Sequence, residues 1–363
     1  MRLVVLGLSI TSSWGNGHAT TFRALLRGMA ARGHEVSFLE RDVPWYAANR
    51  DLPEPPFCRT FLYGEPGELK ERFAGLVADA DTVMVGSYVP DGIEVAAWAC
   101  ATARGVTAFY DIDTPVTLAA LERGECAYLA PGLIPGFDLY LSFTGGPVLE
   151  RLEKVWGARA ARPLYCSVDT DAYRPTGQKP RLALGYLGTY SPDRQPGLDS
   201  LLLEPARRCP KLRFAVAGPQ YPAEIAWPAN VERTEHLPPA AHPGFYGAQL
   251  FTLNVTRADM RAAGHAPSVR LFEAAACGVP VISDRWPGIE ELFRPGEEIL
   301  LAERPEEVVA LLQELPEERR RAIGAAARER VLRAHGAEAR AGELETWLEE
   351  ARRARPGAGR PAA

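Results

Sequence analysis

The chain has few cysteines, and none stands in a metal-binding pattern. Its six cysteines are scattered, with no C-x-x-C pair. Zinc sites and disulfide frameworks depend on paired or regularly spaced cysteines, so this spacing favours reduced, buried thiols. Only Asp111–Asp113 and Asp169–Asp171 resemble carboxylate pairs of a metal loop, and a turn explains the second pair more simply. We therefore expect no metal site.

A basic excess and a long apolar run are also absent. The net charge is −5 at pH 7, whereas nucleic-acid-binding proteins carry a positive excess or a basic stripe. No apolar stretch reaches the roughly 20 residues that a transmembrane helix needs. The apolar start, Met1–Ile10, runs into a glycine-rich loop and not into a cleavage site, so we interpret it as a strand. These absences favour a cytoplasmic protein with no nucleic-acid partner and no integral membrane segment.

Length and pattern predict two α/β domains. The chain has 363 residues, 47% of them hydrophobic, which suits two domains of ordinary size. Strand and helix signals alternate from end to end, as is typical of parallel sheets covered by helices. We expect two Rossmann-like, doubly wound domains that face each other across a cleft. The predicted divisions are an N-terminal domain (1–165), a hinge (166–180), a C-terminal domain (181–335), a helix packing back toward the N-terminal domain (336–354) and a disordered tail (355–363).

The strands of this scheme are predicted from short apolar runs, and the helices from apolar stripes. Strands of the first half are expected at 3–8, 35–39, 82–85, 107–110 and 139–142. Strands of the second half are expected at 182–187, 213–217, 250–255 and 280–283. Helices are expected over 18–32 and, rich in Glu, Arg and Ala, through 305–353.

The segment 268–296 carries the strongest functional signal. Ser268 is a predicted N-cap whose Oγ accepts a first-turn N–H, and Gly278 ends the helix. An apolar stripe on this helix leaves Arg270 and Glu273 free to share another face. The helix N-terminus and Arg270 suit phosphates, and Glu273 suits ribose hydroxyls. This arrangement points to a nucleotide sugar.

The sequence SSWGNGHATTF, at 12–22, is a second candidate. Gly15 and Gly17 let the backbone approach a ligand, and the helix that starts near His18 favours an anion. A plain strand-to-helix turn is the alternative, because the sequence is neither a Walker loop nor a full G-x-G-x-x-G. His18 is either a general base, since histidine titrates near neutral pH, or a helix-start residue with an ordinary hydrogen bond.

Two carboxylates, Asp111 and Asp113, end a predicted strand in the sequence FYDIDTPVTL. Strand alternation should point them to the same side. They could bind the hydroxyls of an acceptor, take its proton, or cap the helix expected at 114–121.

Three loops of the second half carry further candidates. In GYLGTYSPDRQP, Arg194 either clamps a diphosphate or is a solvated arginine on a turn. The turn Gly218-Pro219 either receives a nucleobase or is explained by turn chemistry alone. The loop 254–268 is long and polar, as functional loops often are. Its candidate sugar or phosphate contacts are Arg257, Asp259, His265 and Ser268.

Several of these residues resemble one protein family. FEAAACGVPVISD, from Phe272, and PGIEELFRPGEEIL, from Pro287, are similar to the E-A-x-A-x-G-x-P-V-[VI] block of group 1 (family 4) glycosyltransferases, with Glu291 in register. These enzymes are of the two-Rossmann-domain GT-B type, and the chain is closest to their CgeB-related branch. Arg194 stands where the family usually has a phosphate-binding lysine.

The chain also departs from the family pattern. His265 stands where the E-x7-E motif has its first glutamate, and Thr189 replaces the usual arginine. The first-domain histidine of these enzymes is replaced by Asp111 or Asp113. Gly17-His18 instead resembles the catalytic Gly-His of inverting GT-B transferases.

The resemblance implies a bacterial, metal-independent hexosyltransferase with no cofactor. It would move a sugar from a nucleoside diphosphate sugar, UDP being the expected carrier, to a hydroxyl of a glycan, surface component or secondary metabolite. The first domain would hold the acceptor, and the second the donor nucleotide. Group 1 enzymes retain the anomeric configuration, whereas His18 acting as a base would give inversion.

Each candidate residue has an expected role in this scheme. The expected catalytic residues are His18, Asp111 and Asp113. The expected donor-binding residues are Gly15, Gly17, Gly188, Thr189, Arg194, Gly218, Pro219, Arg257, Ser268, Val269, Arg270, Glu273 and Glu291. Two alternatives stay open: a sugar-nucleotide epimerase or phosphorylase, and a non-catalytic sugar-nucleotide-binding or assembly protein.

Overall fold

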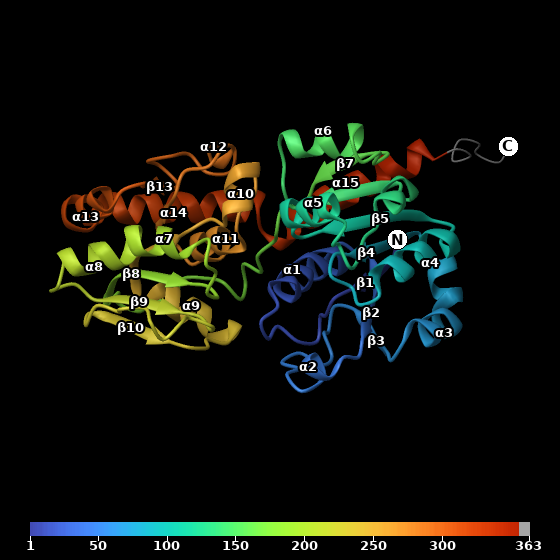
Figure 1. Cartoon of the computed structure of the whole chain (residues 1–363), viewed down its shortest axis with the longest axis horizontal. Coiled ribbons are helices and arrows are strands. Elements are labelled where there is room, and N and C mark those ends of the chain that lie inside the picture. The colour runs from blue at the N-terminus through green and yellow to red at the C-terminus, as the bar shows by residue number, and fades with distance from the viewer. Residues whose placement is uncertain (356–363) are drawn as a thin grey trace. The chain divides into compact units, whose positions relative to one another are not determined.

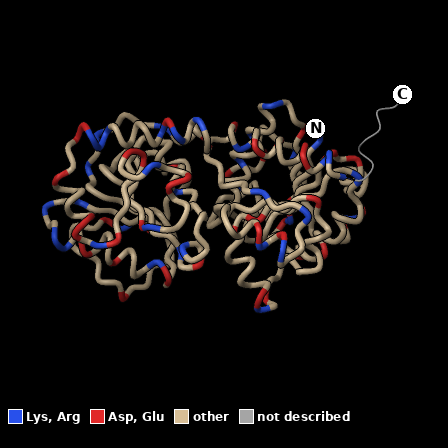
Figure 2. The backbone as a smooth tube through the Cα atoms, turned by 90° about the horizontal axis from the view of Figure 1, so that it is seen from above, with Lys and Arg blue, Asp and Glu red and all other residues tan. Residues whose placement is uncertain are grey.

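The computed structural model describes residues 1–355, and the remaining part of the predicted tail, 356–363, lies outside the described residues. The chain divides into two compact units (Figure 1). The first unit contains residues 1–167 and the chain from Ala337 onward, and the second contains Val168–Gly336. Acidic and basic residues are interspersed along the backbone of each unit (Figure 2).

The first unit is a parallel sheet in the order β3-β2-β1-β4-β5-β6-β7, with helices on both faces. Its strands are β1 (Arg2–Gly7), β2 (Glu35–Arg41), β3 (Arg59–Tyr63), β4 (Thr82–Gly86), β5 (Val106–Asp111), β6 (Leu139–Ser142) and β7 (Ala161–Pro163). Its helices are α1 (Gly17–Ala31), α2 (Pro44–Ala47), α3 (Pro66–Ala78), α4 (Gly92–Thr102), α5 (Thr114–Arg123), η1 (Pro131–Gly136), α6 (Pro147–Lys154) and α15 (Ala337–Ala354).

The second unit repeats this topology with the strand order β10-β9-β8-β11-β12-β13. Its strands are β8 (Leu182–Leu187), β9 (Phe214–Ala217), β10 (Val231–Thr234), β11 (Gln249–Asn254), β12 (Val281–Ser283) and β13 (Leu300–Leu301). Its helices are α7 (Gln195–Leu198), η2 (Asp199–Leu203), α8 (Glu204–Arg208), η3 (Pro239–Ala241), α9 (His242–Gly247), α10 (Ala258–Ala263), α11 (Val269–Ala276), α12 (Ile289–Leu292), α13 (Pro305–Glu314) and α14 (Glu317–Ala334).

The α/β prediction with two Rossmann-like sheets is confirmed. Each predicted strand is present within two residues at either end. The strands that the sequence did not predict are β3, β7, β10 and β13, which are the edge strands of the two sheets. Central parallel strands are buried on both faces and form continuous apolar runs. The edge strand β3 is only partly buried, and its sequence RTFLY lacks such a run.

Helix α15 belongs to the first unit although it follows the second in sequence. It packs closely on α1 at Gly28, where an added Cβ would lie 2.4 Å from the carbonyl oxygen of Ala337. Nε2 of His34 lies 3.2 Å from Oε1 of Glu345. Arg355, predicted to start a disordered tail, instead contacts Asp138, with 2.9 Å between Nη1 and Oδ2. The prediction of disorder is therefore wrong for this residue.

Both sheets change winding direction beside their first strand. In the first sheet β1 lies between β2 and β4, and in the second β8 lies between β9 and β11. Ligands of doubly wound sheets bind outside the carboxyl ends of the strands at this switch point. The topology therefore places the loops after β1 and β4 together in one unit, and those after β8 and β11 together in the other.

Candidate functional site

The loop after β1 in the first unit is held by a buried carboxylate. Glu40, in β2, is fully buried and accepts hydrogen bonds from the backbone N–H groups of Ile10 and Thr11 at 2.7 and 3.0 Å. It also accepts from the hydroxyls of Ser9 and Thr11 at 3.0 and 2.6 Å. In dinucleotide-binding Rossmann domains an acidic residue at about this place binds a ribose hydroxyl. In this protein the Glu40 carboxylate is instead hydrogen-bonded to residues of the loop itself.

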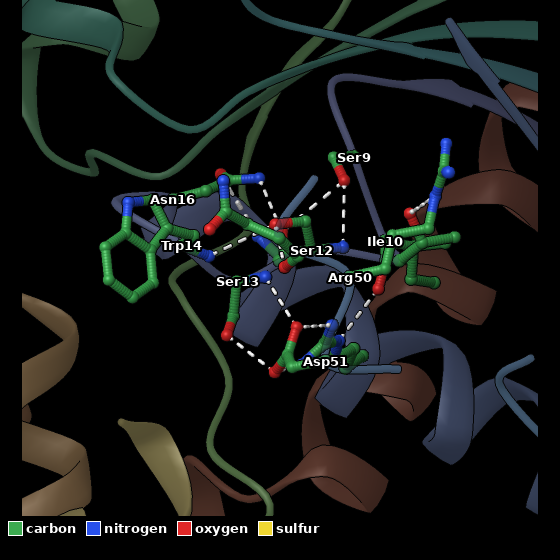
Figure 3. Close-up of polar contacts among 12 residues, drawn as sticks. Ser9, Ile10, Ser12, Ser13, Trp14, Asn16, Arg50 and Asp51 are labelled. Atoms are coloured by element: carbon green, nitrogen blue, oxygen red, sulfur yellow. Dashed lines mark hydrogen bonds and ion pairs between the residues drawn. The ribbon is translucent and has the colours of Figure 1, made fainter. Parts of the chain in front are cut away.

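A second carboxylate, Asp51, fixes the tip of the same loop (Figure 3). Asp51 accepts from the N–H and hydroxyl of Ser13 at 2.8 and 2.7 Å and makes a two-point contact with Arg23 at 2.8 Å. Burial alone would raise the pKa of Asp51, but the hydrogen bonds from Arg23 and Ser13 hold it well below its usual range. The loop before α1 is therefore ordered by its own contacts.

The start of α1 is capped by Asn16. Its side-chain oxygen accepts from the N–H groups of His18 at 3.1 Å and Ala19 at 3.4 Å. The sequence analysis expected N–H groups at this helix start to bind an anion, and the Asn16 side chain binds two of them. Gly15 has a positive φ of 61°, whereas an added Cβ on Gly17 would meet nothing within 4 Å. Gly15 thus forms a turn, and Gly17 faces open space. The Asn16 cap reduces the attraction of the helix start for phosphate.

His18 faces a carboxylate and a tyrosine. Its Nε2 lies 3.8 Å from Oδ2 of Asp113, and its ring meets that of Tyr88 edge-on, with centroids 5.3 Å apart. Its Nδ1 is buried and has no hydrogen-bond partner among the described residues. Catalytic hydrogen bonds are often long without substrate. A histidine beside a carboxylate matches part of the arrangement in which histidine acts as a general base.

Asp111 and Asp113 lie in different surroundings, because β5, which was expected to carry both, ends at Asp111. Asp111 ends β5 and is fully buried, whereas Asp113 lies beyond the strand, and its side chain is 28% exposed. Asp111 accepts from the hydroxyls of Tyr140 at 2.6 Å and Thr117 at 2.8 Å. Burial raises the pKa of Asp111 to about 6, although these hydrogen bonds lower it. Neither side chain caps α5. Asp113 is therefore the carboxylate that faces His18.

In the second unit Arg270 is tied to the carboxyl ends of β8 and β11. Its Nε donates to the carbonyl of Leu187, and its Nη1 donates to Oδ1 of Asn254 at 2.9 Å. The guanidinium lies 4.7 Å from the ring centroid of Tyr186. Gly188 leaves room for it, because an added Cβ would lie 2.6 Å from Arg270 Nη2. The predicted arginine is thus buried and fixed before any ligand binds.

Arg194 is also partly enclosed and is not the solvated arginine of the alternative interpretation. Its Nη2 donates to the carbonyl of Thr189 at 2.8 Å, and its Nε is buried without a partner among the described residues. Burial lowers the pKa of Arg194, and the positive charges of Arg270 and Arg257 lower it further. Arg257 is more exposed and lies 3.9 Å from Asp193. Arg194 and Arg270 therefore both lie against the end of β8 and the loop after it, where an anion would relieve the repulsion between their charges.

The start of α11 differs from the prediction in one detail. Ser268 is the N-cap, but its side chain makes no capping hydrogen bond, so the prediction for Oγ is wrong. The first-turn N–H groups, beginning at Val269, are thus not capped by that side chain. Uncapped donors at a helix start attract phosphate and carboxylate groups. Gly278, with φ of 73°, follows the helix as predicted.

The two predicted glutamates lie in different surroundings. Glu273 is buried and accepts from the Tyr246 hydroxyl at 3.0 Å, and burial together with the charge of Glu273 raises the pKa of Tyr173. A ribose would share this carboxylate with Tyr246. Glu291 is 60% exposed and lies 3.2 Å from Nδ1 of His265. His265 has a positive φ of 48°, and its ring fills the space beside Gly288.

The turn at Gly218-Pro219 packs directly on the loop after β8. A Cβ on Gly218 would lie 2.0 Å from the Gly188 carbonyl oxygen, and Pro219 accepts from the N–H of Tyr190 at 3.0 Å. A polar and aromatic group that the sequence did not predict stands next to this turn. Its members are Tyr221, Trp227 and Arg233, with the Arg233 guanidinium 4.2 and 4.5 Å from the two ring centroids. The aromatic residues that follow Gly218 in the sequence could have indicated this group.

Other features of residues 1–355 bear on partners. This part of the chain contains no group of three or more His, Cys, Asp or Glu side chains placed to hold a metal ion. No helix in it is both long and apolar enough to cross a membrane.

Comparisons with known proteins place the fold. Residues 194–346 match the family model described as glycosyl transferase-like. A search of curated proteins gives no match. Among solved structures, sucrose-phosphate synthase from Thermosynechococcus elongatus is 16% identical, with a TM-score of 0.66, over 98% of this chain and all of that one.

Two further structures have the same fold. Anabaena Alr3699/HepE in complex with UDP is 14% identical, with a TM-score of 0.70, over 96% of this chain and 100% of that one. A glycosyltransferase from Rickettsia africae is 13% identical, with a TM-score of 0.64, over 98% of this chain and 99% of that one. The chain therefore has the two-domain fold of GT-B glycosyltransferases, and residues 194–346 are similar to a glycosyl transferase-like family.

Proposed function

We propose that the protein transfers a sugar from a nucleoside diphosphate sugar to a hydroxyl group. The observation that carries this proposal is that Arg194 and Arg270 both donate hydrogen bonds to the end of β8 and the loop after it, at Thr189 and Leu187, while Arg257 lies on the loop after β11 beside Asp193. A diphosphate offers several acceptor oxygens to guanidinium groups, and such charge-assisted hydrogen bonds are the strong ones. The residues matched by the family model include all three arginines.

Donor binding and activation are assigned to the second unit. Arg270 and Arg194 bind the diphosphate, together with the backbone at Val269, and Glu273 binds the ribose. Gly188, Thr189, Gly218 and Pro219 bring backbone close to the donor. Positive charge aimed at the departing diphosphate stabilises the transition state without a metal ion. The acceptor is assigned to the first unit, at His18 and Asp113.

The donor is proposed to be a UDP-sugar. The support is that the similar structure of HepE was solved with UDP. The CgeB-related branch and a cytoplasmic location remain predictions from the sequence.

A thermal-shift screen against UDP-, GDP-, TDP- and ADP-sugars tests the donor. A ligand that binds only the folded protein raises the melting temperature by mass action. We expect a shift with UDP-sugars that is lost in Arg194→Ala and kept in Arg321→Ala, which removes an arginine whose side chain is 73% exposed in α14. A protein that shifts with none of these sugars would count against the proposal.

The group 1 resemblance favours retention of the anomeric configuration, with the leaving phosphate taking the acceptor proton. Inversion is the second candidate, and the placement of His18 beside Asp113 favours it, because inversion needs a base at the acceptor hydroxyl. The anomeric proton coupling of the first product, measured by NMR before mutarotation, distinguishes the two. His18→Ala should abolish turnover with donor binding intact if His18 is the base.

A further inference from the structure

Two tryptophans are exposed near the carboxyl ends of β1 and β2 in the first unit. Trp14 lies on the loop after β1 and is 38% exposed. Trp45 lies in α2, which follows β2, and is 60% exposed. Single exposed apolar residues are ordinary on a protein surface, whereas grouped ones mark binding surfaces. Whether the two indoles belong to one surface therefore decides their meaning.

A series of hydrogen bonds connects the two tryptophans. The backbone N–H of Trp14 donates to Oγ of Ser12 at 3.4 Å, and that hydroxyl donates to the carbonyl of Asn49 at 2.8 Å. The side-chain amide of Asn49 in turn donates to the carbonyl of Trp45 at 2.8 Å. The two indoles therefore stand on adjoining segments of one surface.

Trp14 is exposed on a loop that is held in place. On one side of it, the N–H and hydroxyl of Ser13 donate to Asp51 at 2.8 and 2.7 Å. On the other side, the N–H of Asn16 donates to the Ser13 carbonyl at 3.2 Å. Figure 3 shows the Trp14 indole pointing away from the contacts between Ser13 and Asp51. A ring that is already fixed loses little entropy when a ligand binds to it.

The segments around the indoles are polar and have no excess of positive charge. Residues 9–17 contain no charged side chain. Residues 40–54 contain four acidic residues (Glu40, Asp42, Asp51 and Glu54) and two basic ones (Arg41 and Arg50). Anionic lipid surfaces attract basic segments, so this composition does not favour a membrane.

Polar side chains also stand beside the indoles. Asn49 connects the two tryptophans, and Asp42, three residues before Trp45, is 43% exposed. These groups interrupt the continuous apolar surface that a flat aromatic ligand would cover. A sugar ring has a face of C–H groups and a rim of hydroxyls, which matches an aromatic face with amide and carboxylate groups at its edge.

We propose that Trp14 and Trp45 form a platform on which a sugar ring of the acceptor stacks, so that the acceptor is a saccharide or a glycoside. The face of an indole carries partial negative charge and the C–H groups of a pyranose carry partial positive charge, so the two attract each other. The inference rests on the proposed function, in which the acceptor binds the first unit. Trp14 lies four residues before His18 on the same loop, beside the candidate acceptor residues.

Saturation-transfer difference NMR tests the platform without the donor. The probes are the methyl glycosides of glucose, galactose, mannose, N-acetylglucosamine and rhamnose, in both anomeric forms. We expect transfer to the ring C–H protons of at least one glycoside. Trp45→Phe keeps an aromatic face and should keep the signal, whereas Trp45→Leu keeps only apolar bulk and should lose it. The control Val155→Ala, which shortens a side chain that is 69% exposed after α6, should leave the signal unchanged.

Kinetics provide the second readout. Losing the aromatic face in Trp45→Leu should raise the KM for the acceptor by about tenfold and leave the KM for the UDP-sugar unchanged. A glycoside signal that Trp45→Leu keeps, or that Val155→Ala also loses, overturns the inference. A wild type that binds UDP-sugars and none of the glycosides also overturns it, while the proposed function stands.

Other occupants give different results. Binding that depends on Trp45 and is stronger for the phenol umbelliferone, or for vesicles of phosphatidylglycerol and phosphatidylcholine, than for every glycoside overturns the assignment to a sugar. If the wild type binds glycosides and transfers no sugar from any nucleotide sugar, the proposed function fails and the platform stands.

Discussion

The loops after β1 and after β8 occupy the same place in two copies of one topology, yet their chemistry is opposite. The first is closed by acidic side chains, with Glu40 and Asp51 taking its N–H and hydroxyl groups. The second is surrounded by the guanidinium groups of Arg194 and Arg270. The fold sets where a ligand can lie, and the side chains decide its charge. The difference supports the proposal that the anionic donor binds at the second loop.

The largest expected effect is that of removing the fixed arginine. Arg270→Ala leaves the Leu187 carbonyl and the Asn254 side chain without their donor and removes the packing on Tyr186. Each buried group left without a partner costs about 1–3 kcal/mol, so we expect a loss of about 4 kcal/mol in the free energy of unfolding. Urea denaturation measures it. A loss below 1 kcal/mol would show that these contacts are dispensable and that the second loop is not built around Arg270.

The next effect concerns the buried carboxylate in β5. The pKa of Asp111 is about 6 in the folded protein, above the value of about 3.9 in an unfolded chain. Between these values the folded state keeps a proton that the unfolded state has lost, so stability falls as the pH rises. Two pKa units correspond to about 3 kcal/mol. We expect this fall between pH 4 and pH 6.

Asp111→Asn supplies the control for that titration, because it cannot ionise. The difference in unfolding free energy between wild type and Asp111→Asn should change by about 3 kcal/mol across pH 4–6. Chemical denaturation at a series of pH values gives both curves. A constant difference would mean that Asp111 titrates in its ordinary range and that its surroundings do not penalise the charge.

The smallest effects come from the glycines, and they compare the two loops directly. Gly188→Ala places a Cβ 2.6 Å from Arg270 Nη2 and 2.8 Å from the Tyr186 hydroxyl, so we expect a loss of about 1–3 kcal/mol and weaker UDP binding. Gly17→Ala meets nothing within 4 Å and should stay within about 0.5 kcal/mol of wild type. Thermal unfolding and calorimetry with UDP measure both. Equal effects at the two positions would remove the proposed distinction between the loops.

The sequence predicted the candidate site unevenly. Gly188, Arg194 and Gly218 were identified because each lies on a loop after a central strand, where ligands of parallel sheets bind, and Arg270 because it lies at the start of a helix. Tyr88 and Asn254 were not, since a tyrosine after a strand and an asparagine at a strand end have many ordinary explanations. The role of Glu273 also depends on Tyr246, which lies 27 residues before it in sequence.

The sequence by itself determined what depends on local pattern. Apolar runs specified the central strands, because burial on both faces restricts those positions to apolar residues. Glycines such as Gly278 specified turns, because a positive φ favours glycine. Only the tertiary structure decided the edge strands, the pairing of His18 with Asp113 and Tyr88, and the buried hydrogen bonds of Arg270. The physical reason is that edge strands bury too little to show an apolar run. Polar partners, in turn, are chosen by which strand ends the topology brings together.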